Sequence, residues 1–456
     1  VRAMASGADV HDLDLVDAMP RLVDRSLVER TTAEDGMTRY HLLETVRAYG
    51  IDHLERQGLL EAARDRHAEY IARVVGRLSS RLLGPNEASL ARRLADYWFD
   101  CGSAFEWSVA TGQWERAVTL LPPSHFWFLG LTTARDRPNA GQTAGRMGRY
   151  AQQQQILAMV HQLRHAMAAA GASGPLYDEV CLRDPRWVAQ VSIDELNELA
   201  WQHLRSLEPV PDHRFGWQIA SSIFPSSQAE ADDLMRELDR LQTTSSAKRV
   251  AANWGVFRTV LRSDYVVDHE RFSRFERYVD DLGSEAARRF VLELRGHIAR
   301  VAGNFADAAR ILGDALTGLD GAEGPDDPFF VVATSWWMTE CSARAGQPVE
   351  LDTVVETWKT VEQAELDVIR PKGECATAMA LATMGETGFA ERFAGWARDH
   401  GQNGVFDLFR VGLADFGLND PPRRPEPEDL NDLLGELNTL SAQKSPASAS
   451  TSITKS

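Results

Sequence analysis

The stretch LVDRSLVERTTAEDGMTRYHLL, residues 22–43, decides the fold of the N-terminal part of this chain. It begins as the end of an apolar-periodic helix and becomes a β-prone run over residues 26–32, rich in Leu, Val and Thr. An Asp-Gly pair then supplies a turn, and residues 37–43 return as a second strand, so a β-hairpin is predicted. Apolar residues at helical spacing follow from residue 42 to 60, and Gly58 ends that helix. Helix, hairpin and helix in this order indicate the back half of a winged helix, with the hairpin as its wing.

Three segments carry a family resemblance: LVDRSLV at 22–28, RYHLLETVRAY at 39–49 and HAEY at 67–70. They resemble the winged-helix-to-repeat junction of actinobacterial STAND-type signalling ATPases, a family that includes AfsR-like and LuxR-type transcription regulators and multidomain class III nucleotide cyclases. The close resemblance covers residues 13–75, with a fainter echo over 105–121. It implies a tetratricopeptide-like (TPR-like) helical array after the junction and an NTPase domain before it. We expect this chain to lack the NTPase domain.

Nucleotide binding is not expected. A phosphate-binding loop requires the order GxxxxGK[ST], because glycines let the backbone approach the phosphates and the Lys contacts them. The 456 residues contain no Gly-Lys pair. The nearest glycine cluster, GQTAGRMG at 141–148, lacks the Lys and is interpreted as a loop between helices. In AfsR-like relatives the resemblance implies a nucleotide-sensing His-Asp pair after the wing, whereas Leu43 and Glu44 stand there in this chain. We therefore predict no cofactor and no catalysed reaction.

The composition is that of a protein that can bury sizeable cores. The chain is 44% hydrophobic and 25% charged, and its 456 residues suggest two to four units. No run of 18 apolar residues occurs, so no membrane contact is expected, and no signal sequence is recognisable at the N-terminus. A cytoplasmic protein is the resulting expectation. The four cysteines fit neither a CxxC metal site nor a disulfide framework, and are predicted to be buried, reduced thiols.

The charge disfavours nucleic acid as a partner. The chain carries a net charge of −17, and residues 11–57 hold six arginines and ten acidic residues. Binding to phosphates depends on clustered Lys and Arg, so this winged helix is interpreted as a packing module and not as a reader of DNA. Pro20 predicts that the helix before the hairpin begins or kinks at this residue, since proline removes a helical hydrogen bond.

Beyond Gly58 the chain reads as a succession of amphipathic helices. Ser192 and Glu195 form a capping box, which predicts a helix that ends near Leu207. Prolines at 209, 211 and 225 mark the main boundary, and a tail rich in Pro and Ser follows residue 420. The predicted domains are a partial winged helix at 1–57, a helical TPR-like region at 58–207, a linker at 208–227, TPR-like repeats at 228–420 and a largely disordered tail at 421–456.

The strongest repeat pattern lies at residues 289–322. Large, small and turn residues fall where a TPR places them. The repeat-defining residues are Leu292, Gly296, Ala299, Gly303, Phe305, Ala308, Leu312 and Ala315. Gly296 and Ala308 are expected to face each other across the helix pair. Three predicted turn glycines, at 303, 346 and 385, are unevenly spaced, which indicates an irregular array.

Two further constellations have both a functional and a structural interpretation. Trp336 and Trp337 point about 100° apart on a helix, so both cannot face a single core stripe. At least one of them is a candidate partner contact, but filling the core between helices is the favoured interpretation. His161 and His165 have metal-ligand spacing, but no third ligand is evident, and interhelical packing is the favoured interpretation.

The predicted fold class is mainly α: a TPR-like helical repeat array (an α-solenoid) preceded by a partial winged helix with a small β-hairpin. The predicted function is a non-catalytic regulatory scaffold that binds a protein partner, or an upstream NTPase or cyclase domain, through TPR-like helices. One alternative is the regulatory C-terminal part of a STAND ATPase or class III cyclase. A second alternative is a DNA-binding transcription regulator.

Overall fold

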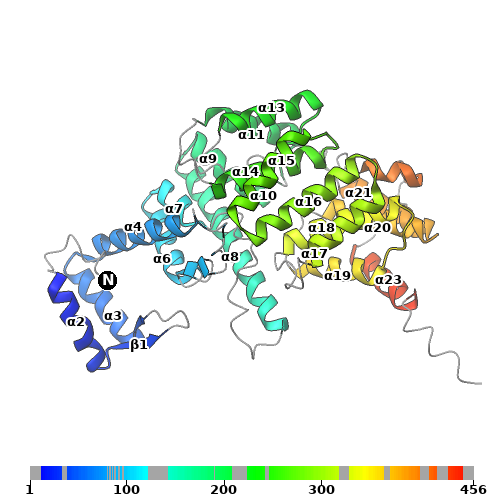
Figure 1. Cartoon of the computed structure of the whole chain (residues 1–456). Coiled ribbons are helices and arrows are strands. Elements are labelled where there is room, and N and C mark those ends of the chain that lie inside the picture. Colours follow the sequence, from blue (N-terminus) through cyan, green and yellow to red (C-terminus); the bar gives the residue numbers. More distant parts are fainter. Residues whose placement is uncertain are drawn as a thin grey trace, which may run out of the picture. The chain divides into compact units, whose positions relative to one another are not determined.

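The computed structural model of this chain is mainly helical and contains one small sheet (Figure 1). The structure describes residues 12–32, 38–79, 81, 84, 86, 89–90, 93–94, 97–121, 142–188, 190–207, 223–241, 246–317, 328–363, 370–400, 410–418 and 430–444. The chain divides into two compact units, residues 1–78 with 96–121 and residues 79–95 with 122–456. The predicted domain limits remain predictions, and most of the predicted linker, residues 208–222, lies outside the described residues.

The first unit begins with the predicted order of helix, hairpin and helix. Its elements are α2 (Asp12–Asp24), β1 (Val28–Thr32), β2 (Thr38–Leu42) and α3 (Glu44–Arg56). The strands pair antiparallel, with Val28 opposite Leu42 and Thr32 opposite Thr38, so the predicted hairpin is confirmed. The predicted Asp-Gly turn lies outside the described residues.

The end of α2 sets the direction in which the chain enters the hairpin. Ser26 adopts a left-handed φ of 56°, and the amides of Ser26 and Leu27 donate to the carbonyls of Val23 and Leu22. This is the Schellman arrangement that closes a helix. Pro20 lies inside α2, which starts at Asp12, so the prediction that the helix begins at Pro20 is wrong. Pro20 is exposed, and water can therefore satisfy the carbonyl that its missing amide leaves open.

Three more helices complete this unit: α4 (Leu60–Ser79), α6 (Trp98–Ala110) and α7 (Trp114–Leu120). Arg116 of α7 donates to Asp65 of α4 at 2.7 Å and to Ser108 of α6 at 3.1 Å. The hydrogen bond from Arg116 lowers the pKa of Asp65, although burial opposes this shift. One arginine therefore joins the three helices.

The second unit is a helical array. Its elements are α8 (Gln142–Ala169), α9 (Pro175–Arg183), α10 (Pro185–Val188), α11 (Ile193–Ser206), α13 (Gln228–Arg240), α14 (Ser246–Arg262), α15 (His269–Leu282), α16 (Glu285–Val301), α17 (Phe305–Thr317), α18 (Pro328–Arg344), α19 (Leu351–Gln363), α20 (Arg370–Thr383), α21 (Thr387–His400), the 3₁₀ helix η5 (Arg410–Phe416) and α23 (Leu430–Lys444). The predicted fold class, a winged-helix-like segment followed by a helical array, is confirmed.

Two local predictions for this unit have opposite outcomes. The hydroxyl of Ser192 accepts a hydrogen bond from the amide of Glu195 at 3.2 Å, so α11 starts at the predicted cap. By contrast, α8 begins at Gln142, so the interpretation of 141–148 as a loop is wrong for its helical part. An isolated glycine only lowers helix propensity by about 1 kcal/mol, which the rest of a 28-residue helix can offset.

Glycine turns join successive helices of the array. Gly303 follows α16, Gly346 follows α18 and Gly385 follows α20, with φ values of +79°, +64° and +82°. Only glycine adopts this left-handed region without strain, so these residues end the helices as predicted. The resulting pairs α16/α17 and α20/α21 pack closely, as do α17/α18 and α18/α20 (Figure 1).

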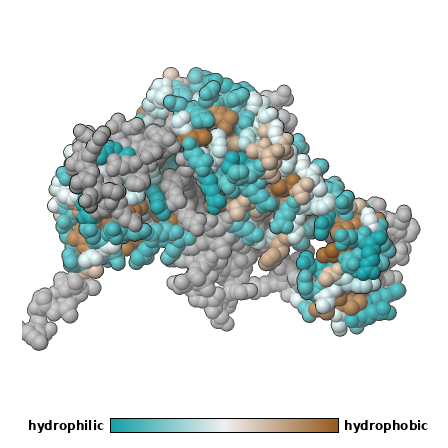
Figure 2. Space-filling view, turned by 180° about the vertical axis from the view of Figure 1, so that it is seen from behind, coloured by the Kyte–Doolittle hydropathy of each residue, from teal (hydrophilic) through white to brown (hydrophobic). Residues whose placement is uncertain are grey.

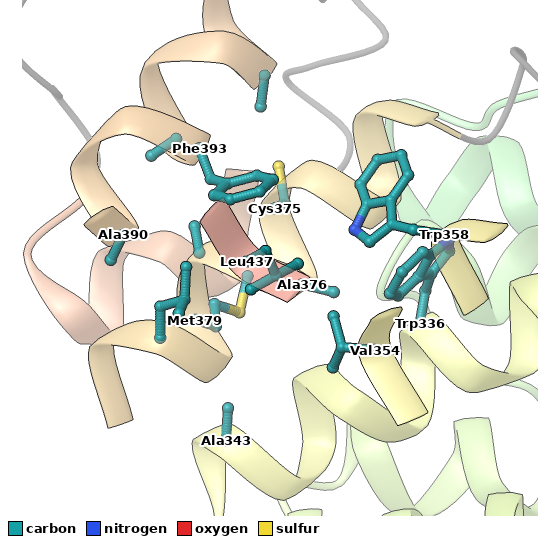
Figure 3. Close-up of a cluster of buried hydrophobic side chains, with 14 of the residues drawn as sticks. Trp336, Ala343, Val354, Trp358, Cys375, Ala376, Met379, Ala390, Phe393 and Leu437 are labelled. Atoms are coloured by element: carbon teal, nitrogen blue, oxygen red, sulfur yellow. The ribbon is translucent and has the colours of Figure 1, made fainter. Parts of the chain in front are cut away.

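A cluster of buried hydrophobic side chains lies in the last third of the chain (Figure 3). Trp336, Val354, Met379 and Phe393 contribute to it from four successive helices. Helix α23 adds Leu430, Leu433 and Leu437, all buried, so residues 430–444 of the tail form part of the core. The surface seen in Figure 2 is mostly hydrophilic, with scattered hydrophobic areas.

The predicted repeat at 289–322 contains the helix pair α16 and α17, but the contact between the two helices differs from the prediction. A Cβ placed on Gly296 would lie 2.7 Å from both Cγ and Cδ2 of Leu312. Leu312, and not Ala308, therefore fills the space over Gly296. Ala308, Leu312 and Ala315 are buried, as their TPR-like positions require. The spacing within each helix was predictable, whereas the offset between the two helices depends on how they cross.

Replacement of Gly296 by alanine is expected to destabilise the array by about 1–3 kcal/mol, because the new methyl group overpacks a fully buried Leu312. Gly435→Ala in α23 is the matched control, since among the described residues no atom beyond the local backbone of this helix lies within 4 Å of the added Cβ. The free energy of unfolding of the control should rise by up to about 1 kcal/mol, because alanine has a higher helix propensity than glycine. Urea denaturation followed by circular dichroism measures both changes, and equal effects would contradict the observed contact between the two helices.

Candidate functional site on the winged helix

Helix α3 has no fully buried residue, and its apolar positions are half-buried. None of its 13 residues is buried, although Val46, Ile51 and Leu54 give it apolar positions at helical spacing. Isolated helices shorter than about 12–15 residues are marginally stable in water, and helices in proteins gain most of their stability by packing an apolar side. This helix therefore retains an apolar surface that can pack against something else.

Large hydrophobic side chains around α3 are exposed as well. Tyr49 in α3 is 67% exposed, and Leu42 at the end of β2 is 52% exposed. We call the set the exposed apolar residues of the winged helix: Tyr40, Leu42, Leu43, Tyr49 and Leu59. Single exposed hydrophobics are ordinary, whereas a contiguous patch of them marks an interaction surface, and these five lie within twenty residues of sequence.

The charges on α3 are largely neutralised within the helix. Arg47 pairs with Glu44 at 3.3 Å, and Arg56 pairs with Asp52. Helix α2, which precedes the wing, contains four aspartates and one arginine. A protein that binds DNA phosphates releases counterions through unpaired Lys and Arg, and this half of the winged helix supplies few of them. Its surface suits an apolar partner better than a polyanion.

The two tryptophans predicted as partner contacts lie inside the protein. Trp336 is fully buried and stacks at an angle on Trp358, with 5.2 Å between the ring centroids. Trp337 is also buried and faces His297 edge-on at 5.1 Å. The expectation of an exposed tryptophan is therefore wrong, because α18 packs against α17, α19 and α20 and so buries more than one side. The favoured interpretation, core filling, describes both residues.

The paired histidines have structural partners. The His161 and His165 rings meet edge-on with centroids 4.3 Å apart. Nδ1 of His161 lies 3.0 Å from Asp184, and Nε2 of His165 lies 3.0 Å from a guanidinium nitrogen of Arg164. A cation beside His165 disfavours a metal ion. Within the described residues, no group of three potential ligands could hold one.

The cysteines are inert by environment. All four are buried and free, as predicted: Cys101, Cys181, Cys341 and Cys375. Burial raises the pKa of the Cys101 and Cys341 thiols to about 12. Since the thiolate is the reactive form, these side chains are unsuited to nucleophilic chemistry at neutral pH.

Sequence reasoning missed the largest polar constellation of the array. Glu293 is completely buried in α16 and accepts hydrogen bonds from Trp254 and Arg258 of α14. Glu293, His297 and Arg300 recur at helical spacing on one side of α16, and this was the available indication. The two donors to Glu293, Arg258 and Trp254, lie 35 and 39 residues away in sequence, and no local pattern reveals them.

Comparison with known proteins agrees with the N-terminal geometry. Residues 3–75 match a family described as a winged helix-turn-helix domain. The chain is similar, at 32% identity over 120 residues, to three mycobacterial proteins that carry the name "Putative HTH-type transcriptional regulator". One is from Mycobacterium bovis and two are from strains of Mycobacterium tuberculosis. The matched stretch covers 26% of this chain and 13% of each relative. No solved structure matches the chain.

These findings establish an N-terminal winged helix-turn-helix domain. The similar region spans a small part of the relatives, so it does not carry their complete activity to this chain. In the described part of the chain, no helix is long and apolar enough to cross a membrane.

Proposed function

We propose that this chain is a non-catalytic regulatory protein whose winged helix binds another protein domain through its exposed apolar residues. The observation that carries the proposal is α3, a 13-residue helix without a buried residue beside five exposed large hydrophobic side chains. Burial of apolar surface contributes about 25 cal/mol per Å². A protein surface that covers Leu43 and Tyr49 would therefore gain free energy and would also stabilise α3.

The helical array is proposed to act as a TPR-like scaffold in a STAND-type signalling system. Its support is the glycine-turned helix pairs and the resemblance of residues 13–75. In this proposal, the partner of the winged helix is an NTPase or class III cyclase domain, either upstream or on another chain, and the protein works in the cytoplasm. The chain itself neither binds ATP nor catalyses a reaction, and calorimetric detection of micromolar ATP binding would contradict this.

DNA binding is the second candidate function. The winged helix-turn-helix match and the names of the similar mycobacterial proteins favour it. The local charge opposes it, because α2 is acidic and the α3 arginines are paired. The protein-binding proposal is therefore preferred for this half of the winged helix.

The test of protein binding compares the wild type with a Leu43→Ala, Tyr49→Ala double variant. Each is immobilised and exposed to extract of the source cells, and bound proteins are quantified by mass spectrometry. We expect at least one protein that the wild type retains and the double variant binds about tenfold less, since truncating a buried aromatic anchor costs about 1–2 kcal/mol or more. Phe99→Ala is the control, because Phe99 is 88% exposed in α6. Identical retention by all three proteins would refute the proposal.

The DNA alternative has its own measurement. Fluorescence anisotropy with labelled duplexes at physiological salt should show no sequence-specific binding. Nanomolar binding that is lost in an Arg25→Gln, Arg30→Gln double variant would establish DNA binding and overturn our preference. Both arginines are exposed, so the substitutions leave the fold intact.

A further inference from the structure

A buried cationic cluster surrounds Trp337 in the helical array. Lys372 Nζ lies 3.6 Å from the indole ring centroid, and the guanidinium carbons of Arg300 and Arg262 lie 4.5 and 6.0 Å from it. The His297 ring meets the same indole edge-on. We call Arg262, His297, Arg300, Trp337 and Lys372 the Trp337 cluster. It brings together α14, α16, α18 and α20.

Two of its cations have acidic partners of their own. Arg300 Nη1 donates to Asp264 at 2.5 Å, and Lys372 pairs with Glu340. Arg344, which also pairs with Glu340, has Asp415 at 2.8 Å. These pairs follow the rule that a buried charge is retained only with a partner.

Arg262 differs from these residues. Its closest described carboxylate oxygen is Glu293 Oε1 at 3.5 Å, and that atom already accepts a hydrogen bond from Arg258 Nε at 2.8 Å. Among the described residues, neither Nε nor Nη2 of Arg262 has a hydrogen-bond acceptor. The side chain is 21% exposed, although Nε and Nη2 themselves are buried.

Further donors near Trp337 are also unused. Nε of Arg300 and both ring nitrogens of His297 have no hydrogen-bond partner in the described structure, although His297 Nε2 lies 3.8 Å from Glu293 Oε1. Burial lowers the pKa of His297 to about 3, so the ring is neutral at pH 7 and offers one N–H donor. A buried donor without an acceptor costs about 1–3 kcal/mol, and an incoming acceptor would remove this cost.

We propose that Arg262, together with His297 and Arg300 around Trp337, binds the oxyanion group of a small molecule, either a carboxylate or a phosphate. A guanidinium presents parallel N–H donors that match two oxygens of either group. The ligand-free site also favours an anion electrostatically. Burial and then Arg258 hold the pKa of Arg262 well below its ordinary value, although Glu293 opposes this shift; Arg300 lowers the pKa further, and a bound anion would offset the repulsion between these arginines.

A purely structural role for Arg262 makes the opposite prediction about stability. If Arg262 mainly supports Glu293, its removal should destabilise the protein. Glu293 nevertheless keeps Trp254 and Arg258 as donors at 2.9 and 2.8 Å when Arg262 is absent. In our proposal, Arg262→Gln leaves the melting temperature of the anion-free protein unchanged or raised, because it removes a partly buried cation that shares its carboxylate, Glu293, with Arg258.

The experiment uses the full chain, with inorganic phosphate and citrate as separate probes and potassium chloride at equal ionic strength as reference. Binding is followed by calorimetry and by the rise in melting temperature with anion concentration. For at least one probe we expect saturable binding by the wild type, and a dissociation constant about tenfold or more higher for Arg262→Gln. Response to one probe alone assigns a phosphate or a carboxylate as the ligand group.

Arg310→Gln is the matched control, since Arg310 is an exposed arginine of α17 with 63% of its side chain accessible. It should bind both probes as the wild type does. Phosphate and citrate also stabilise proteins nonspecifically, so only a difference between Arg262→Gln and the control counts. Equal responses of all three proteins, no saturable binding by the wild type, or a lower anion-free melting temperature of Arg262→Gln would each overturn the proposal. The winged helix belongs to the other compact unit, so these results do not depend on its binding activity.

Discussion

Replacement of Glu293 by glutamine is expected to destabilise the helical array by about 3–5 kcal/mol, the cost of removing one partner from a buried ion pair. Burial alone would raise the pKa of Glu293, but Arg258 and then His297 and Arg262 hold it below its ordinary value. The carboxylate is therefore ionised at neutral pH. Glutamine has nearly the same shape, so the loss measures charge and not volume.

The physical reason is the number of groups that depend on one carboxylate. Arg258 is 2% exposed and donates to Oε1, while Trp254 donates to Oε2. The neutral amide of glutamine can accept through only one oxygen, and its NH₂ group would face a donor. Arg258 would then remain as a buried cation without a counter-charge.

Urea denaturation monitored by circular dichroism measures the effect. Glu356→Gln is the control, because Glu356 is 70% exposed and pairs only with Lys359 of its own helix in the described structure. Exposed pairs of this kind contribute at most about 1 kcal/mol. If the free energy of unfolding falls by the same small amount in both variants, the buried network does not stabilise the array.

Local features of the fold were predictable from the sequence. The hairpin followed from two β-prone runs around an Asp-Gly pair, and the helix ends followed from Gly303, Gly346 and Gly385. Each of these patterns acts over a few residues, through turn geometry or helix capping. Ala308 and Ala315 of α17 are buried, as their TPR-like positions predict, since the period of a helix fixes which residues share a face.

Features that depend on packing between distant segments were not predictable. The space over Gly296 is filled by Leu312 because of the offset between two helices. The exposed apolar residues of the winged helix could not be told from core residues, since hydrophobic spacing is the same in both cases. The Trp337 cluster combines residues from four helices, and only His297 and Arg300, which share one side of α16, left a local pattern in the sequence. Similarly, the pair Trp336 and Trp337 was expected to have one solvent-facing side, but α18 has neighbours around it.

Replacement of Trp336 by alanine is expected to cost about 3–5 kcal/mol, as for other buried large aromatic side chains. Trp336 is fully buried and contacts Trp358 within the cluster drawn in Figure 3. Thermal melts should show the loss, while Phe99→Ala, at a position 88% exposed, should change stability by less than about 0.5 kcal/mol. A Trp336→Ala variant with wild-type stability would restore Trp336 as a candidate partner contact.

Gly373 allows a sharper test of the same packing. A Cβ on Gly373 would lie 2.8 Å from Cε2 of Trp336, so the indole rests directly against the backbone of α20. Gly373→Ala alone should therefore be destabilising, because a rigid ring cannot yield as a flexible side chain can. In the Trp336→Ala background the ring is gone, and the added methyl group enters the space it leaves. The double variant should then be more stable than the sum of the two single losses predicts, by about 1 kcal/mol or more. Additive losses would show that the indole does not occupy the space over Gly373.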